Sequence, residues 1–250
     1  MFVVSLVGQK GGTGKTTICL GLACAAAAAG HTVAAIDLDP QATASKWKDR
    51  RAEDNPAVVS AQASRLNPAL DVARAANADF VFIDSAGRSD DSALAAARAA
   101  DLILVPTRTS IVEIETLPAV TDLLRIAGRI NRAFIVLNGL HPSAGAAGIE
   151  DARQMMRSLY GLASYSRHLC QRSAYSDAML TGTTPQERDP DGKAGQELGQ
   201  LFEFVIEQAK LRTGDQVMLP TSDLAKLPTG DPAKLRTADQ EKLETTELTN

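Results

Sequence analysis

A glycine-rich segment near the start of the chain carries the residue types best suited to holding an anion. Gly11, Gly12 and Gly14 let the backbone turn with positive φ, so that consecutive N–H groups can point at one set of phosphate oxygens. Lys15 follows at a position from which it can reach β- and γ-phosphates, and the hydroxyl of Thr16 is placed to bind a magnesium ion. The spacing therefore predicts a loop that binds a nucleotide together with Mg²⁺.

The segments on either side of this loop have the patterns of a strand and a helix. The apolar run 2–7 precedes the loop, and a helix-forming run at 16–29 follows it. A helix that begins at the loop adds its unsatisfied N–H groups and the positive end of its dipole to the same site. A strand, a loop and a helix in this order favour a phosphate-binding loop over a chance glycine-rich turn.

The loop departs from the common phosphate-loop pattern in a specific way. Gln9 stands where that pattern has its first glycine, and a second lysine, Lys10, directly precedes the glycine pair. The segment resembles the deviant Walker A sequence of the ParA/MinD class of ATPases. This resemblance implies ATP and Mg²⁺ as ligands and catalytic roles for Lys10 and Lys15, with Lys10 crossing a homodimer interface to the nucleotide of the other subunit. It assigns nucleotide binding to Gly11, Gly12, Thr13, Gly14, Lys15, Thr16 and Thr17.

Two later apolar runs, 33–36 and 80–83, end in acidic residues. Asp37 and Asp39 follow the first run, and Asp84 follows the second. Carboxylates at the carboxyl ends of parallel strands lie where open α/β sheets bind their ligands. The resemblance implies that Asp39 orients the attacking water, that Asp37 lies closer to the magnesium shell, and that Asp84 is the Walker B residue that holds the metal through its water shell. Asp37 and Asp84 thus join Thr16 as the candidate metal site.

The resemblance continues to about residue 209. The short segment 85–87 and the segment 169–182 resemble the ParF branch of small plasmid-partition ATPases. Asn138 ends a further apolar run, and in relatives an asparagine at this place contacts the adenine. Since Asn138 precedes Gly139, it also fits an ordinary turn-forming asparagine, and both interpretations stand at this point.

Apolar runs alternate with helical patterns along these residues. The runs at 2–7, 33–36, 80–83, 102–105 and 133–137 are continuous, which is typical of buried parallel strands. Helical patterns lie at 16–29, 41–51 (with Pro40 expected in its first turn), 68–76, 91–100, 111–127, 150–160 and 194–211. The alternation predicts an α/β fold with a doubly wound, mostly parallel sheet and helices on both faces, the phosphate-loop ATPase fold.

The composition fits one cytoplasmic domain. The 250 residues are 44% apolar and 22% charged, which allows one sizeable core. The three cysteines show neither metal nor redox spacing, the alanine tract at 25–29 is too short to span a bilayer, and no signal peptide precedes the first strand. We therefore expect a cytoplasmic protein without a membrane partner.

From about residue 210 onward the character of the chain changes. One leucine recurs every eight residues, at Leu211, Leu219, Leu227, Leu235 and Leu243. A period of eight does not match a helix, and a segment with one recurring leucine position per repeat and no aromatic residue cannot bury enough surface to fold alone. We therefore expect an ATPase domain at 1–209 and a disordered tail at 210–250, whose repeats offer several weak docking points to a partner.

Basic residues concentrate in one part of the chain, although its net charge is -4. Residues 123–176 contain seven arginines against two acidic residues, hence a local charge of +5. A localised basic field suits non-specific contact with DNA phosphates, and the resemblance to partition ATPases points to the same partner. The candidates are Arg153, Arg157, Arg167 and Arg172. The alternative is that several of these arginines cap helices or pair with acids.

These features together predict an ATP-dependent dimerisation switch for partition of plasmid or chromosomal DNA, or for positioning of a cargo. The ATP dimer binds DNA and the ADP state releases it, so the protein is expected on the nucleoid. Since no built-in arginine finger is evident, hydrolysis is expected to be slow until a ParB-like or other adaptor protein stimulates it.

Three other functions occur in the same loop class. A DNA-transfer accessory ATPase shares the fold and remains an alternative. A MinD-like, membrane-associated division regulator relies on a basic amphipathic C-terminal helix, whereas this chain ends in an acidic, proline-interrupted repeat. An iron–sulfur carrier would need paired cysteines, which the sequence lacks.

Overall fold

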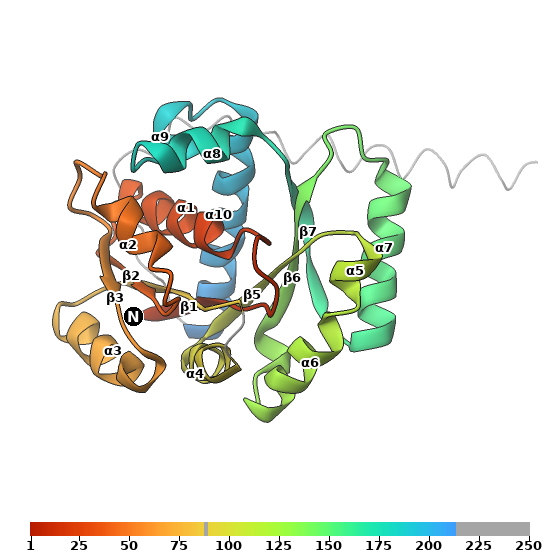
Figure 1. Cartoon of the computed structure of the whole chain (residues 1–250), viewed down its shortest axis with the longest axis horizontal. Coiled ribbons are helices and arrows are strands. Elements are labelled where there is room, and N and C mark those ends of the chain that lie inside the picture. The colour runs from red at the N-terminus through yellow and green to blue at the C-terminus, as the bar shows by residue number, and fades with distance from the viewer. Residues whose placement is uncertain (88–89, 214–250) are drawn as a thin grey trace, which may run out of the picture. The chain divides into compact units, whose positions relative to one another are not determined.

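Seven parallel strands form one sheet in this computed structural model, which describes residues 1–87 and 90–213 (Figure 1). The strand order is β3-β2-β4-β1-β5-β6-β7, so β1 lies at the centre between β4 and β5. The strands are β1 (Phe2–Leu6), β2 (Val33–Asp37), β3 (Ala57–Ser60), β4 (Phe80–Asp84), β5 (Leu102–Thr107), β6 (Ala133–Leu140) and β7 (Ala163–Cys170). The predicted doubly wound α/β fold is confirmed.

Helices fill the connections between these strands, and three more follow β7. They are α1 (Lys15–Ala28), α2 (Thr43–Lys48), α3 (Leu66–Ala75), α4 (Asp90–Ala99), α5 (Ile111–Ile114), α6 (Leu117–Ile126), α7 (Ala146–Tyr160), α8 (Ser173–Leu180), α9 (Pro185–Arg188) and α10 (Lys193–Thr213). The helix predicted at 111–127 is broken into α5 and α6, because Pro118 in the first turn of α6 lacks the N–H that a continuous helix needs. The expectation that Pro40 lies in the first turn of a helix is wrong, since it lies in a turn and α2 begins only at Thr43.

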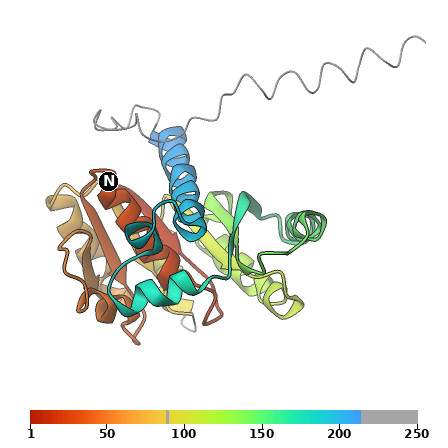
Figure 2. The same ribbon diagram turned by 90° about the horizontal axis from the view of Figure 1, so that it is seen from above.

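Each face of the sheet has its own core because successive strand residues point to opposite sides. Val3 and Val81 pack with residues of α3, α4, α6 and α7 on one face. Val4 and Phe82 pack with α1 and α10 on the other. In Figure 2, α10 is drawn in blue and lies beside α1. Burial on both faces explains why the central strands read as continuous apolar runs.

The two edge strands are absent from the sequence prediction. Most residues of β3 are exposed, and β7 buries only part of its length. Neither strand therefore carries the continuous apolar run that identifies a strand covered on both faces. The omission of β7 matters for function, because Arg167 lies on this strand and Arg172 follows its end.

The last described helix runs past the predicted end of the domain. α10 continues through residue 209 to Thr213 and so includes the first leucine of the repeat, Leu211, which is exposed. The other repeats, at 214–250, lie outside the described residues, and the disordered tail stays a prediction. No helix in the described ranges combines the length and apolar character needed to cross a membrane.

Candidate nucleotide-binding site

The glycine-rich segment forms a loop between β1 and α1. Gly12 and Gly14 have φ of 78° and 92°, backbone conformations that are strained for any residue with a Cβ. Gly14 is the N-cap residue of α1, and no side chain caps this helix. The first N–H groups of α1 are therefore left to a ligand, as expected at an anion site. The predicted order of strand, loop and helix is confirmed.

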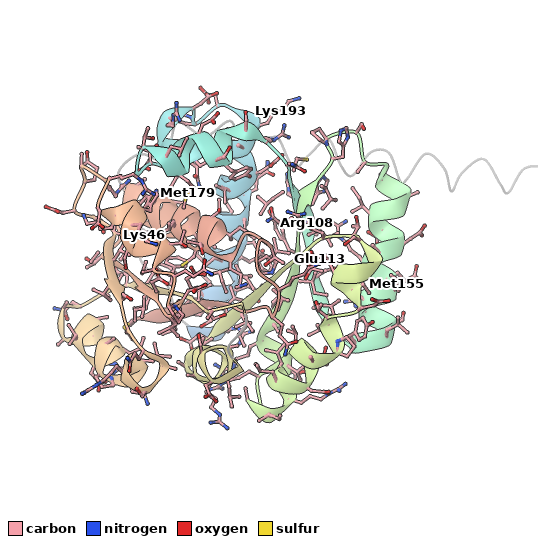
Figure 3. All side chains as sticks on the ribbon, viewed as in Figure 1. Lys46, Arg108, Glu113, Met155, Met179 and Lys193 are labelled. Carbon is pink, nitrogen blue, oxygen red and sulfur yellow. The ribbon has the colours of Figure 1, made fainter. Side chains whose placement is uncertain are left out.

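A cleft of about 680 Å³ opens over this loop. The loop residues and Thr17 form one wall, and the segment after β2, including Asp39 and Thr43, forms another. Gly87 and Met179 complete the lining. In Figure 3, Met179 lies on the α8 side of the loop, and Arg108 and Glu113 lie on the α5 side. The cleft sits at the carboxyl ends of the central strands, where sheets of this topology bind ligands.

Lys15 folds back over its own loop. Its Nζ donates a hydrogen bond of 2.9 Å to the carbonyl of Lys10. Burial lowers the pKa of Lys15, and the charges of Asp84 and Asp39 oppose this effect. The lysine is thus a buried amine whose only hydrogen bond in the described residues is to a neutral carbonyl. The phosphates of a nucleotide would offer it a stronger, charged partner.

Thr16 and Asp84 come together as the sequence predicted. The Thr16 hydroxyl donates a 2.6 Å hydrogen bond to Oδ2 of Asp84, and the other oxygen, Oδ1, is buried with no partner among the described residues. Burial raises the pKa of Asp84 to about 7, an effect that the Thr16 hydrogen bond opposes and nearby Asp37 reinforces. A buried carboxylate with an orphaned oxygen fits a site that receives a cation.

The set of acidic side chains suits magnesium rather than an all-protein metal cage. Within residues 1–87 and 90–213, no three His, Cys, Asp or Glu side chains converge to hold an ion. Mg²⁺ is usually held by one or two protein oxygens together with substrate phosphates and water. Thr16 and Asp84 supply oxygens of this kind beside the phosphate loop.

Asp37 holds the backbone that follows β2. Its Oδ1 accepts the N–H of Asp39 at 3.0 Å, and its Oδ2 accepts the N–H groups of Ala44 at 3.0 Å and Ser45 at 3.4 Å. Burial raises the pKa of Asp37, and these backbone hydrogen bonds oppose it. Both oxygens are therefore engaged in fixing the start of α2, a role the sequence did not suggest. Proximity to the magnesium shell stays a prediction for this residue.

Asp39 lies on the cleft wall and is half-buried. Its Oδ1 accepts the N–H of Gln41 at 2.9 Å, which holds the carboxylate in one orientation. The water-orienting role stays a prediction for this residue.

Two charged residues of this site were missed by the sequence reasoning, and both follow β5. Glu113 is 7% exposed, and its Oε1 forms an ion pair with Nζ of Lys10 at 3.1 Å. Arg108 donates a 3.3 Å hydrogen bond to the carbonyl of Gly12. Their place after a predicted strand could have identified them, because charged residues at the carboxyl ends of parallel strands converge on the same edge of the sheet.

Asn138, near the end of β6, supports the loop directly. Its Nδ2 donates a 2.7 Å hydrogen bond to the carbonyl of Thr13, and a Cβ added to Gly14 would collide with this amide. The contact explains why a glycine and an asparagine face each other here. Contact with adenine stays a prediction.

The four candidate DNA-binding arginines do not form one set of free cations. Arg172 makes two hydrogen bonds, of 2.6 and 3.1 Å, to Oε1 of Glu197. Arg153 is 14% exposed and contacts a carboxylate and a carbonyl of its own chain. Arg157 and Arg167 are exposed and form no ion pair with any described residue. The structure thus shows the alternative, pairing with acids, for Arg153 and Arg172, and leaves Arg157 and Arg167 available to a partner.

Comparisons with known proteins agree with this geometry. Residues 4–185 match the family model described as the CobQ/CobB/MinD/ParA nucleotide binding domain. Among curated proteins, maintenance of carboxysome distribution protein A of Gloeobacter kilaueensis is 29% identical over 191 residues, which cover 72% of this chain and 82% of that protein. Protein virC1 of Rhizobium rhizogenes is 27% identical over 121 residues, covering 46% of this chain and 52% of the relative.

A solved structure confirms the fold. The septum site-determining protein MinD of Pyrococcus horikoshii, complexed with Mg-ADP, superimposes with a TM-score of 0.65. The match covers 84% of this chain and 98% of that protein at 19% sequence identity.

Proposed function

Because the chain belongs to the family of CobQ/CobB/MinD/ParA nucleotide-binding domains, we propose that it is a Mg²⁺-dependent ATPase that dimerises with ATP and thereby partitions DNA or positions a cargo. The observation that carries the proposal is the presence of two lysines in one loop. Lys15 covers its own loop, whereas Lys10 is 38% exposed and bound to Glu113 instead. One lysine suffices for the chain's own phosphates, so the other is available to the nucleotide of a second copy. We assign this activity to residues 1–209, with α10 continuing to Thr213.

The residues of the cleft have defined tasks when ATP binds. The N–H groups of the loop and of the first turn of α1 bind the phosphates. Lys15 would donate to phosphate oxygens in place of the carbonyl of Lys10, and Thr16 and Asp84 would hold the Mg²⁺. Bound Mg²⁺ supplies charge neutralisation at the β- and γ-phosphates. Asp39 then accepts a hydrogen bond from the attacking water and orients it.

Dimerisation links the nucleotide to DNA. Arg157 and Arg167 are exposed cations on α7 and β7, and two copies present twice as many phosphate contacts as one. Because the affinity for DNA rises steeply with the number of neutralised phosphates, the dimer binds and the monomer releases. A ParB-like or other adaptor would stimulate hydrolysis. Through its contacts with DNA, the ATP-bound dimer would associate with the nucleoid in the cytoplasm. The resemblance to a carboxysome distribution protein supports positioning of a cargo.

Light scattering with a non-hydrolysable ATP analogue and Mg²⁺ tests the proposal. The wild type is expected to form dimers with the analogue and monomers with ADP. Lys10→Ala is expected to bind the analogue and stay monomeric. Lys46→Ala removes an exposed lysine of α2 and serves as the matched control, which should dimerise normally. A wild type that stays monomeric at saturating analogue, or a Lys10→Ala protein that dimerises, would contradict the proposal.

A further inference from the structure

The C-terminal end of α2 is fastened to the segment that joins α8 to α9. Trp47 on α2 is fully buried and packs against Leu20 and Cys24 of α1. Its Nε1 donates a 3.0 Å hydrogen bond to the carbonyl of Thr183. A six-residue helix has little stability of its own, so such tertiary contacts fix where it lies.

Arg51, just after α2, extends this attachment. Its guanidinium lies 4.9 Å from the centre of the Trp47 ring and contacts both oxygens of Glu187, at 2.6 and 3.1 Å. It also donates to the carbonyl of Gly182 at 3.1 Å. The side chain of Arg51 is 4% exposed and that of Glu187 is 28% exposed, so this bidentate pair is partly shielded from water. We call Trp47, Arg51, Gly182, Thr183 and Glu187 the α2 latch.

The backbones meet closely at the α2 latch. Gly182 has φ of 67°, and a Cβ added there would lie 2.5 Å from the N of Arg51. Glu187 also accepts hydrogen bonds from the N–H and the hydroxyl of Thr184, at 2.8 and 3.0 Å. The carboxylate thus joins the start of α9 to the end of α2. Together these contacts fix the position of α2 relative to residues 182–187.

The opposite end of α2 is fixed by Asp37, which accepts the N–H groups of Ala44 and Ser45. Between Asp37 and α2 lies the segment that carries Asp39 to the cleft. Ala42 in this segment has φ of 52°, a left-handed conformation that is unfavourable for a residue with a Cβ. Such a conformation persists when both ends of the segment are held.

We propose that Trp47 and Arg51 are positioning residues for ATP hydrolysis: through the α2 latch they hold α2, and α2 holds Asp39 at the angle needed to orient water. This inference rests on the proposed function, in which Asp39 performs that task. Neither residue lines the cleft over the phosphate loop, so their loss affects the chemical step and not the binding of ATP. Residues 182–187, more than 140 positions away from Asp39 in sequence, thereby become part of the catalytic arrangement.

Two variants of the full-length protein test the inference. Glu187→Gln removes the charge that anchors Arg51, and Arg51→Lys keeps the charge but loses the bidentate geometry. Asp71→Asn disrupts an exposed pair with Arg74 on α3 and serves as the control. The measurements are kcat for ATP hydrolysis, the Kd of a non-hydrolysable analogue, and hydrogen exchange of the amides at 39–45.

We expect kcat to fall by about tenfold in both variants, with the Kd of the analogue changed by less than about twofold. Amide exchange at 39–45 should accelerate while α1 stays protected, and the Asp71→Asn protein should match the wild type. Unchanged kcat, or a Kd that weakens in parallel with kcat, would overturn the inference. A wild type that hydrolyses no ATP would instead contradict the proposed function, and faster exchange at 39–45 in the variants would still report the attachment.

Discussion

The amine of Lys10 lies 3.1 Å from a carboxylate oxygen of Glu113, although the two residues are more than 100 positions apart. The contact exists because β1 and β5 are neighbours, so the segments that follow them share one edge of the sheet. Glu113 is 7% exposed and Lys10 is 38% exposed, so the lysine is held at the surface by a buried acid. In the dimer that we propose, Lys10 must leave this partner before it can reach the other subunit's phosphates.

Glu113→Gln should therefore favour dimerisation. Without the ion pair Lys10 is released at lower cost, and the concentration at which half of the ATP-bound protein is dimeric should fall by about fivefold, which corresponds to roughly 1 kcal/mol. Sedimentation velocity at a series of protein concentrations measures this midpoint. Glu115→Gln makes the same chemical change at a nearby exposed position and should leave the midpoint unchanged. Weaker dimerisation of Glu113→Gln would show that the pair helps to build the dimer.

Asp84 should make the nucleotide-free protein less stable as the pH rises. Its pKa is about 7 in the folded chain, against an ordinary aspartate value of 3.8, so between these values the folded state binds more protons than the unfolded state. The free energy of unfolding therefore falls from pH 4 to pH 7, by up to about 4 kcal/mol for this group, and stays low above pH 7.

Asp84→Asn should remove most of this dependence. Without nucleotide or Mg²⁺, Tm should rise by roughly 5 °C at pH 8 and by much less at pH 5, whereas ATP hydrolysis should be lost. Thermal unfolding followed by circular dichroism at the two pH values measures the difference. An equal change in Tm at both values would show that the Asp84 carboxylate does not titrate in this range.

Arg157 and Arg167 should bind DNA through phosphates alone. Arg157→Ala and Arg167→Ala should each weaken the ATP-dependent binding of a random duplex and reduce the slope of log K against log salt by about one per subunit. Fluorescence anisotropy at several salt concentrations gives both quantities. Arg125→Ala is a suitable control, because that arginine is already paired with Asp122. Binding that remains equal to wild type at low salt in both variants would remove these residues from the interface.

Arg172 should behave as a structural residue. Glu197 is 15% exposed beside Arg172, and Arg172→Ala removes its charged partner, although the carboxylate still accepts the N–H of Cys170 and the hydroxyl of Tyr175. Loss of one partner from this partly buried pair is expected to cost about 2 kcal/mol, measurable as a lower urea midpoint. The double variant Arg172→Met with Glu197→Gln removes both charges, keeps an amide oxygen for the Cys170 N–H and the Tyr175 hydroxyl, and should recover part of that loss. If Arg172→Ala unfolds at the wild-type midpoint and binds DNA poorly, the arginine serves DNA instead.

The sequence predicted the parts of the fold and site that depend on local pattern. Strands buried on both faces appear as continuous apolar runs, so β1, β2, β4, β5 and β6 could be found. Glycine spacing located the loop, and the residue types after β4 located the carboxylate that meets Thr16. The partly exposed β3 and β7 gave no such run, since burial on one side only leaves a mixed pattern.

What the sequence could not predict depends on which distant segments become neighbours. The pairing of Lys10 with Glu113 requires the strand order, and the pairing of Arg172 with Glu197 requires the position of α10 against β7. The resemblance gave Asp37 a place near the magnesium shell, which stays a prediction, whereas its hydrogen bonds to the start of α2 were not predicted. Only the turn at Ala42 brings the amides of α2 to its oxygens, and no local pattern announces that turn.

Trp47, on the helix that follows Asp39, is the only tryptophan in the chain. It lies fully buried against the guanidinium of Arg51. The tryptophan fluorescence of the unmodified protein therefore comes from one indole, next to the segment that carries Asp39. Its emission wavelength reports the contacts of α2 with α1 and Thr183, so the protein carries its own optical probe of the proposed hydrolysis cycle and needs no attached dye.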